Sequence, residues 1–234
     1  MAKTIVIVGF GPGTSTAVAE KFGSEGFSVA LIGRNADRLA AGVSMLKGRG
    51  IQALAFTADA ANPDSIRSAI RNVRSQAGPI NVIQWSAYGG LETADLLGAD
   101  NAGLRSAIDV AVFGLLAAAS EALPDLRRDG TGAILVQNGA LSETTAPADE
   151  MATQLGAVGL ALSGAAKHKL VGLLAQRLKD DGVYVAEVMV HPTIKNTPGE
   201  NANFAVDPSV IAAKYWDLYQ ARSDTHADIA LANA

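Results

Sequence analysis

Short, nearly continuous apolar runs alternate with longer mixed stretches along most of this chain. The runs lie at residues 3–10, 27–33, 51–59, 79–87, 132–139 and 183–190. Unbroken apolarity over a few residues is typical of parallel strands that are covered on both faces, and the stretches between the runs are long enough for helices. Strands and helices that alternate through right-handed crossovers build a doubly wound parallel sheet. We therefore predict an α/β, Rossmann-type fold with a parallel sheet of about seven strands and helices on both faces.

The pattern changes only near the end of the chain. No Pro/Ser-rich linker or internal repeat divides residues 1–234, so they are predicted to form a single domain. The segment after Thr193 is more polar and carries one further helical stretch. In that stretch Tyr215, Trp216 and Tyr219 recur at helical spacing, which predicts a lid or a core-packing face. We expect residues 193–225, approximately, to form a substrate loop and lid helix within the same domain.

Composition narrows the possible classes of function. Hydrophobic residues make up 49% and charged residues 18% of the chain, as in ordinary globular proteins, and a net charge of −4 gives no electrostatic reason to expect a nucleic-acid partner. There is no cysteine, which excludes disulfides, thiolate metal sites and cysteine nucleophiles. The three histidines show no metal-ligand spacing, so no metal is expected. Neither the N-terminus nor any later apolar run reads as a membrane span, and we expect a cytoplasmic protein without a membrane partner.

A glycine-rich turn, GFGPGTS, joins the first apolar run to the first helical stretch. Such a turn places backbone N–H groups and a helix N-terminus against a pyrophosphate. Two dinucleotide-binding spacings fit in part. GxGxxG would use Gly9 and Gly11 but has Thr14 at its third position, and GxxxGxG would use Gly9 and Gly13 but has Ser15 at its third position. Because the turn follows a strand and opens a helix, we predict that Gly9, Gly13, Thr14 and Ser15 contact a dinucleotide. Ser15 is expected to weaken binding by crowding the closest approach of helix and backbone.

The end of the second apolar run predicts the kind of dinucleotide. An acidic residue there would bind the ribose 2′-hydroxyl of NAD, whereas an arginine would accommodate the 2′-phosphate of NADP. Gly33 stands at the acidic position, and Arg34 and Asn35 follow it. A guanidinium pairs well with phosphate and here has no neighbouring carboxylate to compete for it. We predict that Arg34 and Asn35 bind NADP(H), and that NAD(H) binds less well.

With these motifs in order, the chain resembles a short-chain dehydrogenase/reductase over nearly its whole length. The matching features are the glycine turn, GRNADRLA, TADAANPDSI, GPINVIQWSA and the flanks of the last two apolar runs. The resemblance implies that Asp59 and Ala60 border the adenine, and that Ser86 and Ala87 lie near the nicotinamide-side ribose. It also implies that Ile194 lies near the carboxamide or the phosphates, and that two long Ala/Gly-rich helices form the interface of a homodimer or homotetramer.

The catalytic positions are where the resemblance fails. Members of this family use a serine after the fifth strand, a Tyr-x-x-x-Lys pair on the following long helix and an asparagine on the preceding one. Alignment with the family places Gly139, or its neighbour Asn138, at the serine, Leu160 at the tyrosine, Gly164 at the lysine and Ala111 at the asparagine. A positioned general acid contributes about 10²–10⁴-fold to the rate, and leucine and glycine donate no proton. The catalytic residues are therefore unknown.

Two residues could replace the missing proton donor. His191 follows the sixth strand, and Tyr88 follows the fourth, both at the carboxyl edge of the sheet where such folds bind ligands. The structural alternatives are a His-Pro turn for His191 and aromatic packing for Tyr88. Ser142 and Glu143 are expected to face solvent in a loop, and His168 is expected to lie on the packing side of its helix.

Three functions remain open. The first is an NADP(H)-dependent oxidoreductase with a silent or unconventional site. The second is a non-catalytic sensor or partner subunit that binds NADP(H). The third is a lyase or isomerase that uses the same crevice without redox chemistry. The sequence does not name a small-molecule substrate.

Overall fold

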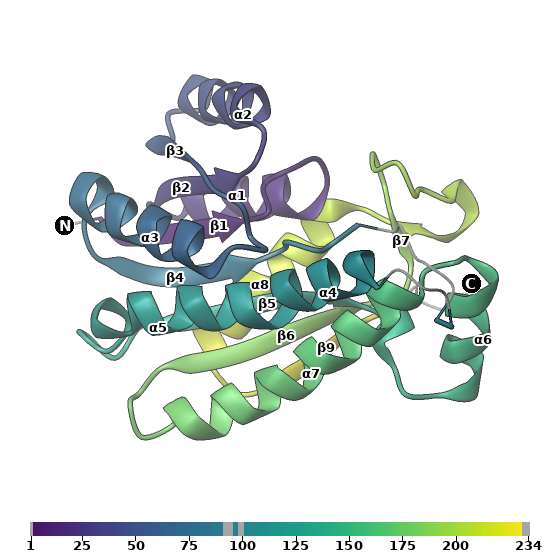
Figure 1. Cartoon of the computed structure of the whole chain (residues 1–234). Coiled ribbons are helices and arrows are strands. Elements are labelled where there is room, and N and C mark those ends of the chain that lie inside the picture. The colour runs from purple at the N-terminus through teal and green to yellow at the C-terminus, as the bar shows by residue number, and fades with distance from the viewer. Residues whose placement is uncertain (1, 91–95, 98–100, 231–234) are drawn as a thin grey trace.

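The computed structural model describes residues 2–90, 96–97 and 101–230. Its centre is a seven-stranded parallel sheet with the strand order β3-β2-β1-β4-β5-β6-β9 (Figure 1). The prediction of a doubly wound α/β fold is confirmed. The strands are β1 (Thr4–Val8), β2 (Ser28–Gly33), β3 (Ala53–Thr57), β4 (Ile80–Trp85), β5 (Ala133–Gly139), β6 (Tyr184–Val190) and β9 (His226–Ile229).

Helices cover both faces of this sheet. One face carries α1 (Thr14–Ser24), α2 (Ala36–Gly48) and α8 (Pro208–Ala221), and the other carries α3 (Pro63–Ala77), α5 (Leu115–Leu126) and α7 (Val158–Leu178). A π-helical turn, η1 (Asp109–Gly114), joins α4 (Ala102–Ile108) to α5 without a break. The shorter elements are η2 (Ala140–Ser142), α6 (Ala146–Gln154), β7 (Thr193–Ile194), η3 (Ala202–Phe204) and β8 (Ala205–Val206).

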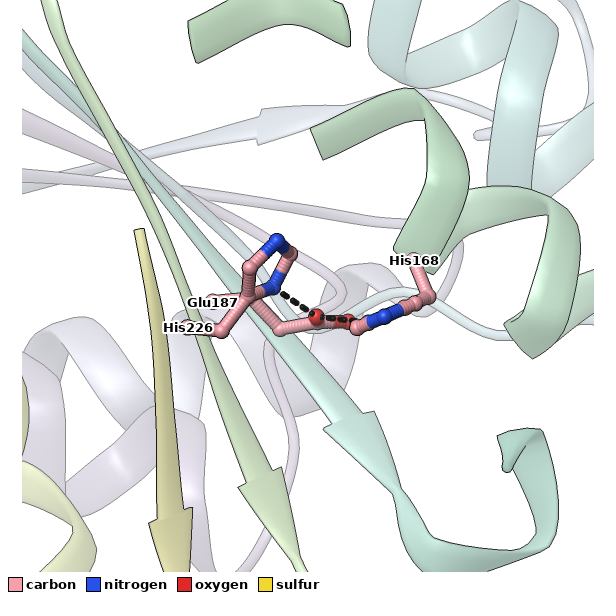
Figure 2. A group of neighbouring side chains, drawn as sticks. All are labelled: His168, Glu187 and His226. Atoms are coloured by element: carbon pink, nitrogen blue, oxygen red, sulfur yellow. Dashed lines mark hydrogen bonds and ion pairs between the residues drawn. The ribbon is translucent and has the colours of Figure 1, made fainter. Parts of the chain in front are cut away.

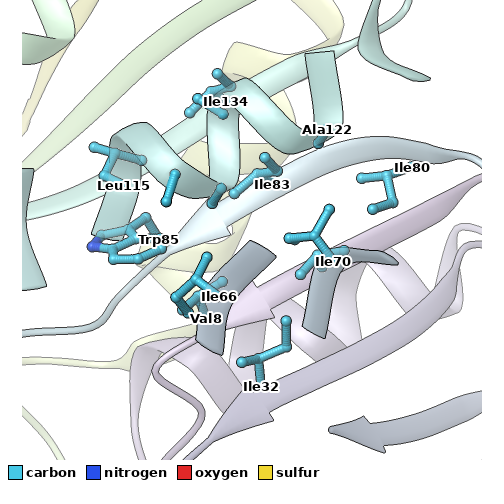
Figure 3. Packing of buried hydrophobic residues seen from close by; sticks show 14 of the residues in the cluster. Val8, Ile32, Ile66, Ile70, Ile80, Ile83, Trp85, Leu115, Ala122 and Ile134 are labelled. Carbon is cyan, nitrogen blue, oxygen red and sulfur yellow. The ribbon is translucent and has the colours of Figure 1, made fainter. Parts of the chain in front are cut away.

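Helix α3 illustrates how local sequence sets these elements. Asn62 caps its N-terminus by accepting from the backbone N–H groups of Asp64 and Ser65, and Pro63 supplies a first turn that needs no donor. Its apolar residues recur at helical spacing, so Ile66 and Ile70 are buried on one side. Figure 3 shows the cluster that they join, in which Trp85 and residues of β1, β2, β4, β5 and α5 also pack. This packing fixes the strand ends that build the site.

Two helical segments are long and apolar enough to cross a membrane by length and composition. They are Ala102–Leu126, with a mean hydropathy of 1.6, and Val158–Leu178, with a mean hydropathy of 1.2. The expectation that no apolar run reaches this length is wrong. In this fold α5 packs against β4, and α7 packs against β5 and β6, which accounts for the apolar residues on their inner sides.

The aromatic residues of the last helix form a core-packing face, which is one of the two alternatives that their spacing predicted. Helix α8 packs against α1, and its Tyr215 is fully buried while Tyr219 is 5% exposed. Trp216 lies edge-on to Phe22, with ring centroids 5.2 Å apart. The helix is therefore part of the core rather than a lid. Strand β9, which the sequence did not predict, then pairs in parallel with β6 and closes the sheet edge.

Candidate functional site

A crevice of 720 Å³ lies at the carboxyl ends of β1 and β4, where the strand order reverses. This is the position at which open α/β sheets bind ligands. The structure brings most of the predicted cofactor residues to its walls: Gly9, Thr14, Ser15, Arg34, Asn35, Asp59, Ala60, Ser86, Ala87 and Ile194. Gly13 does not line the crevice itself but packs against Thr197, which does.

Two glycines of the turn have positive φ and no room for a side chain. Gly9 has φ +88°, and a Cβ there would lie 2.4 Å from the backbone N of Ala87. Gly13 has φ +87°, and a Cβ there would lie 2.7 Å from a methyl group of Thr197. Because residues with a side chain rarely adopt such φ values, glycine is required at both positions. The glycine turn can therefore pack directly against the backbone of Ala87 and against the side chain of Thr197.

The first residues of α1 give the turn its polar character. The hydroxyl of Thr14 is buried without a hydrogen-bond partner among the described residues, at a helix N-terminus beside the crevice. A buried unpaired hydroxyl is costly, and one at this place can donate to an anion. Ser15 also has a structural role, beside the crowding of the ligand that we predict. Its Oγ lies 2.9 Å from both the N and the O of Gly11, so the side chain braces the turn internally.

Two arginines stand at the far end of the crevice. Arg34 is exposed and has no ion pair or side-chain hydrogen bond within the described part of the chain. Arg38, which the sequence analysis did not single out, lines the same wall from the first turn of α2. Asn35 has a structural role as well, because its side chain accepts from the backbone N–H of Arg38 at 2.8 Å and caps the helix. The side chain of Asp59 accepts from the backbone N–H of Ala61 at 3.0 Å.

A chain of polar side chains forms part of the floor of the crevice. Gln84 donates to the hydroxyl of Ser86 at 2.6 Å, and Ser86 donates to Gln137 at 3.0 Å. Gln137 lies on β5, the next strand of the sheet, and also lines the crevice. Sequence reasoning missed Gln84 and Gln137, although a glutamine inside an otherwise apolar strand is a signal that could have been noticed.

The four positions implied for catalysis have different surroundings. Gly139, at the end of β5, has room for a side chain, since a Cβ there would have its nearest neighbour, the carbonyl oxygen of Val190, at 3.8 Å. Ala111 is buried in the π-helical turn, and Leu160 is half-buried in α7. Gly164 has no room, because a Cβ there would lie 2.0 Å from the Oγ of Ser142. Ser142 of η2 therefore occupies the space beside Gly164, the residue aligned with the family's lysine.

The side chain that fills this position is held firmly. Ser142 is 4% exposed, which corrects the expectation that it faces solvent. Its hydroxyl donates to the side-chain oxygen of Asn138 at 2.7 Å. The amide of Asn138 donates in turn to the backbone oxygen of Gly164 at 2.9 Å and to Glu187 at 2.6 Å. These bonds tie η2, β5, β6 and α7 together.

The two alternative proton donors are not in the same place. Tyr88 lines the crevice and is 58% exposed. His191 does not line it but lies between two carboxylates, with Nε2 3.0 Å from Asp228 and Nδ1 3.6 Å from Glu143. Of the two, only Tyr88 is placed where a ligand in the crevice could meet it.

A second polar cluster was missed entirely. His168 is exposed rather than packed, and with His226 it meets the buried carboxylate of Glu187, so two of the three histidines do converge on an acidic group. Lys167, the neighbour of His168, is buried on the same helix. Burial lowers the pKa of Lys167 to about 8, and the negative charge of Glu187 opposes that shift.

Comparison with known proteins supports the architecture. A sequence model of the short chain dehydrogenases matches residues 3–205. A 3-oxoacyl-(acyl-carrier-protein) reductase of Staphylococcus aureus is 27% identical over 70% of this chain and 68% of its own length. A dehydrogenase/reductase from Sinorhizobium meliloti has a TM-score of 0.84 at 25% identity, covering 98% of this chain and 94% of that one. A blue fluorescent protein from a metagenomic library, solved in complex with NADPH, has a TM-score of 0.83 at 20% identity, covering 97% of this chain and 96% of its own.

Proposed function

This chain belongs to the short-chain dehydrogenase family, and we propose that it binds NADP(H) in the crevice without the family's usual catalytic residues. The unpaired hydroxyl of Thr14 at the start of α1 carries the first part of this proposal. Together with the tightly packed Gly9 and Gly13, it forms a cradle that fits a pyrophosphate. When bound, a reduced nicotinamide would supply a hydride.

The choice of NADP(H) over NAD(H) rests on the two arginines. Arg34 and Arg38 line the end of the crevice, and Asp59 is the only acidic residue among the described lining residues. Its carboxylate accepts from the backbone of Ala61, in the turn after β3. Two guanidinium groups without a competing acid at the end of β2 favour a 2′-phosphate over a free 2′-hydroxyl.

Titration calorimetry with NADPH and with NADH tests the binding proposal. We expect NADPH to bind at least about tenfold more tightly, a difference of about 1.4 kcal/mol. Arg34→Ala should remove most of that difference and leave NADH binding nearly unchanged. Lys47→Ala, at the other end of α2, is the matched control for loss of a positive charge. Equal affinities for the two dinucleotides in the unmodified protein would refute the choice of NADP(H).

The second part of the proposal concerns chemistry. Carbonyl reduction needs a proton for the substrate oxygen in addition to the hydride. Neither Leu160 nor Gly164 can donate one, and the space beside Gly164 is taken by Ser142. Ordinary reduction of the family's kind should therefore be slow or absent with NADPH saturating. The lack of a proton donor at these two positions supports a protein that binds NADP(H) as a sensor or that catalyses a reaction with other residues.

A reductase with a relocated donor is the second candidate, and Tyr88 favours it. The hydroxyl of Tyr88 stands in the crevice and is largely exposed. In this alternative it gives its proton to the substrate oxygen while the carbonyl carbon accepts the hydride. A screen of carbonyl compounds that follows NADPH absorbance separates the candidates. Turnover that Tyr88→Phe abolishes and His191→Ala leaves intact would establish the reductase, and no turnover would support the first.

We also propose that the chain forms a homodimer or homotetramer through the outer sides of η1, α5 and α7. The η1 turn contacts α7 and continues into α5, and these segments expose large apolar side chains, including Phe113 at 51% and Leu162 at 44%. Light scattering should give a dimer or larger at micromolar concentration, and Phe113→Asp with Leu162→Asp should give a monomer. Val210→Asp, an equally exposed position on α8, should leave the assembly intact. A monomeric unmodified protein would refute the proposal.

A further inference from the structure

Three residues from distant parts of the chain meet on the α7 side of the sheet. Glu187 on β6 pairs in register with His226 on the edge strand β9. His168 reaches them from α7 (Figure 2). The Glu187 side chain is 1% exposed, whereas those of His168 and His226 are 45% and 44% exposed. A buried carboxylate is thus reached by two imidazoles from the solvent side.

The contacts converge on a single oxygen. Oε2 of Glu187 lies 2.5 Å from Nδ1 of His168 and 3.0 Å from Nδ1 of His226. The other oxygen, Oε1, accepts from the amide of Asn138 at 2.6 Å. One ligand atom from each of the three residues lies within 4.8 Å of the others. Both Nδ1 atoms therefore face the same carboxylate oxygen, so all three side chains could bind one ion.

We propose that His168, Glu187 and His226 bind a Zn²⁺ ion. Two imidazole nitrogens and one carboxylate oxygen are a donor set that zinc accepts, with bonds of about 2.0–2.2 Å. Each imidazole would bind the ion through Nδ1, and a neutral ring would then carry its single proton on Nε2. Tetrahedral bonds of this length need donor atoms about 3.3 Å apart. For His168, the distance from Nδ1 to Oε2 would have to lengthen from 2.5 Å by about 0.8 Å.

The surroundings fit a three-ligand site. Asn138 holds Oε1, which orients the carboxylate and leaves Oε2 for the ion, as hydrogen-bonded neighbours of metal ligands do. A hollow of 320 Å³ adjoins the two imidazoles and is lined also by Gly172 and Leu173. It leaves the fourth zinc position open to water. The ion would offset the charge of the buried carboxylate, although Lys167 lies near enough to oppose a further positive charge.

The site would join the last strand to the body of the fold. The ion would bridge His226 of β9, at the sheet edge, and His168 of α7. Through Asn138 it also reaches Ser142 and Gly164, because one amide bonds Glu187 and the backbone of Gly164. Zinc binding should therefore raise the melting temperature of the protein.

Calorimetric titration of the tag-free, chelator-treated chain with ZnCl₂ tests the proposal, and the visible spectrum with Co²⁺ reports the coordination. We expect saturable binding of one ion per chain and a higher melting temperature with zinc. His168→Ala and His226→Ala should each weaken binding at least about tenfold. Because both side chains are half-exposed, these variants should fold, which circular dichroism checks.

His191→Ala is the matched control, since His191 is the third histidine of the chain and contacts Asp228 and Glu143 instead. It should bind zinc as the unmodified protein does. Absence of one-to-one binding would overturn the proposal. Equal affinity in the variant that lacks both His168 and His226 would do so as well, as would loss of binding on His191→Ala.

Discussion

Gly9 and Gly164 both lack room for a Cβ, but for different reasons. At Gly9 the neighbour is the backbone of residues 86 and 87, and the close approach leaves the crevice open beside it. At Gly164 the neighbour is the side chain of Ser142, which occupies the space in which a larger residue would lie. The crevice beside the glycine turn is thus open, whereas the space beside Gly164, on the helix aligned with the family's catalytic helix, is occupied by Ser142.

This difference teaches that the position of Gly164 is set by packing with its neighbours as well as by the residue type. Ser142 is bonded to Asn138, and Asn138 is bonded to Glu187 and to the backbone of α7. A lysine could not enter at Gly164 unless this network moved. Four substitutions, ordered by expected effect, break or sharpen the comparison.

Gly9→Ala should have the largest effect. The new Cβ would meet backbone atoms that cannot move independently, and the residue would keep a φ of +88°. We expect a loss of about 3 kcal/mol in the free energy of unfolding, from strain and overpacking together. Urea unfolding followed by circular dichroism measures it. Gly11→Ala is the control, because its Cβ would have its nearest neighbour, the Arg38 guanidinium, at 3.8 Å. Equal stability of the two variants would contradict the tight approach at Gly9.

Gly164→Ala should cost about 1–3 kcal/mol of unfolding free energy, although alanine is a better helix former than glycine. The cause is the 2.0 Å approach of its Cβ to the Ser142 hydroxyl. In a Ser142→Gly background the same substitution should cost less, although Oδ1 of Asn138 would still lie 2.9 Å from the new Cβ. A double-mutant cycle in urea measures the difference. If the two substitutions are additive, Ser142 does not block this position.

Thr14→Val tests the open half of the site. Valine keeps the shape of the side chain and removes the buried hydroxyl that has no partner among the described residues. The dinucleotide-free protein should become more stable by about 1 kcal/mol. NADPH binding should weaken about tenfold, which corresponds to about 1.4 kcal/mol. Thermal unfolding and calorimetry give the two numbers. Lower stability with unchanged NADPH affinity would mean that the hydroxyl has a structural role only.

Ser15→Ala should have the smallest effect. It removes the hydroxyl that bonds both backbone atoms of Gly11, so the turn loses about 1 kcal/mol of stability and binds NADPH a few-fold more weakly. Ser24→Ala removes the same group at the other end of α1, where it bonds Lys21, and should leave NADPH affinity unchanged. Tighter binding of NADPH by Ser15→Ala would instead support the prediction that this side chain crowds the ligand.

The sequence by itself determined the features that depend on neighbours along the chain. Apolar runs predicted the strands from β1 to β6. The glycine turn, with Thr14, Arg34 and Asn35, predicted that the crevice lies at the carboxyl edge of the sheet. Strand β9 escaped prediction because His226–Ile229 carries polar residues at a sheet edge, where apolar periodicity is weak.

Only the tertiary structure decided the packing of Ser142 under Gly164 and the meeting of His168, Glu187 and His226. Each joins side chains from segments that are far apart in sequence. The histidine pair depends on the register that places His226 beside Glu187. No spacing along the chain encodes that register, because it is set by the packing of α8 and by the pairing of the last strand with β6.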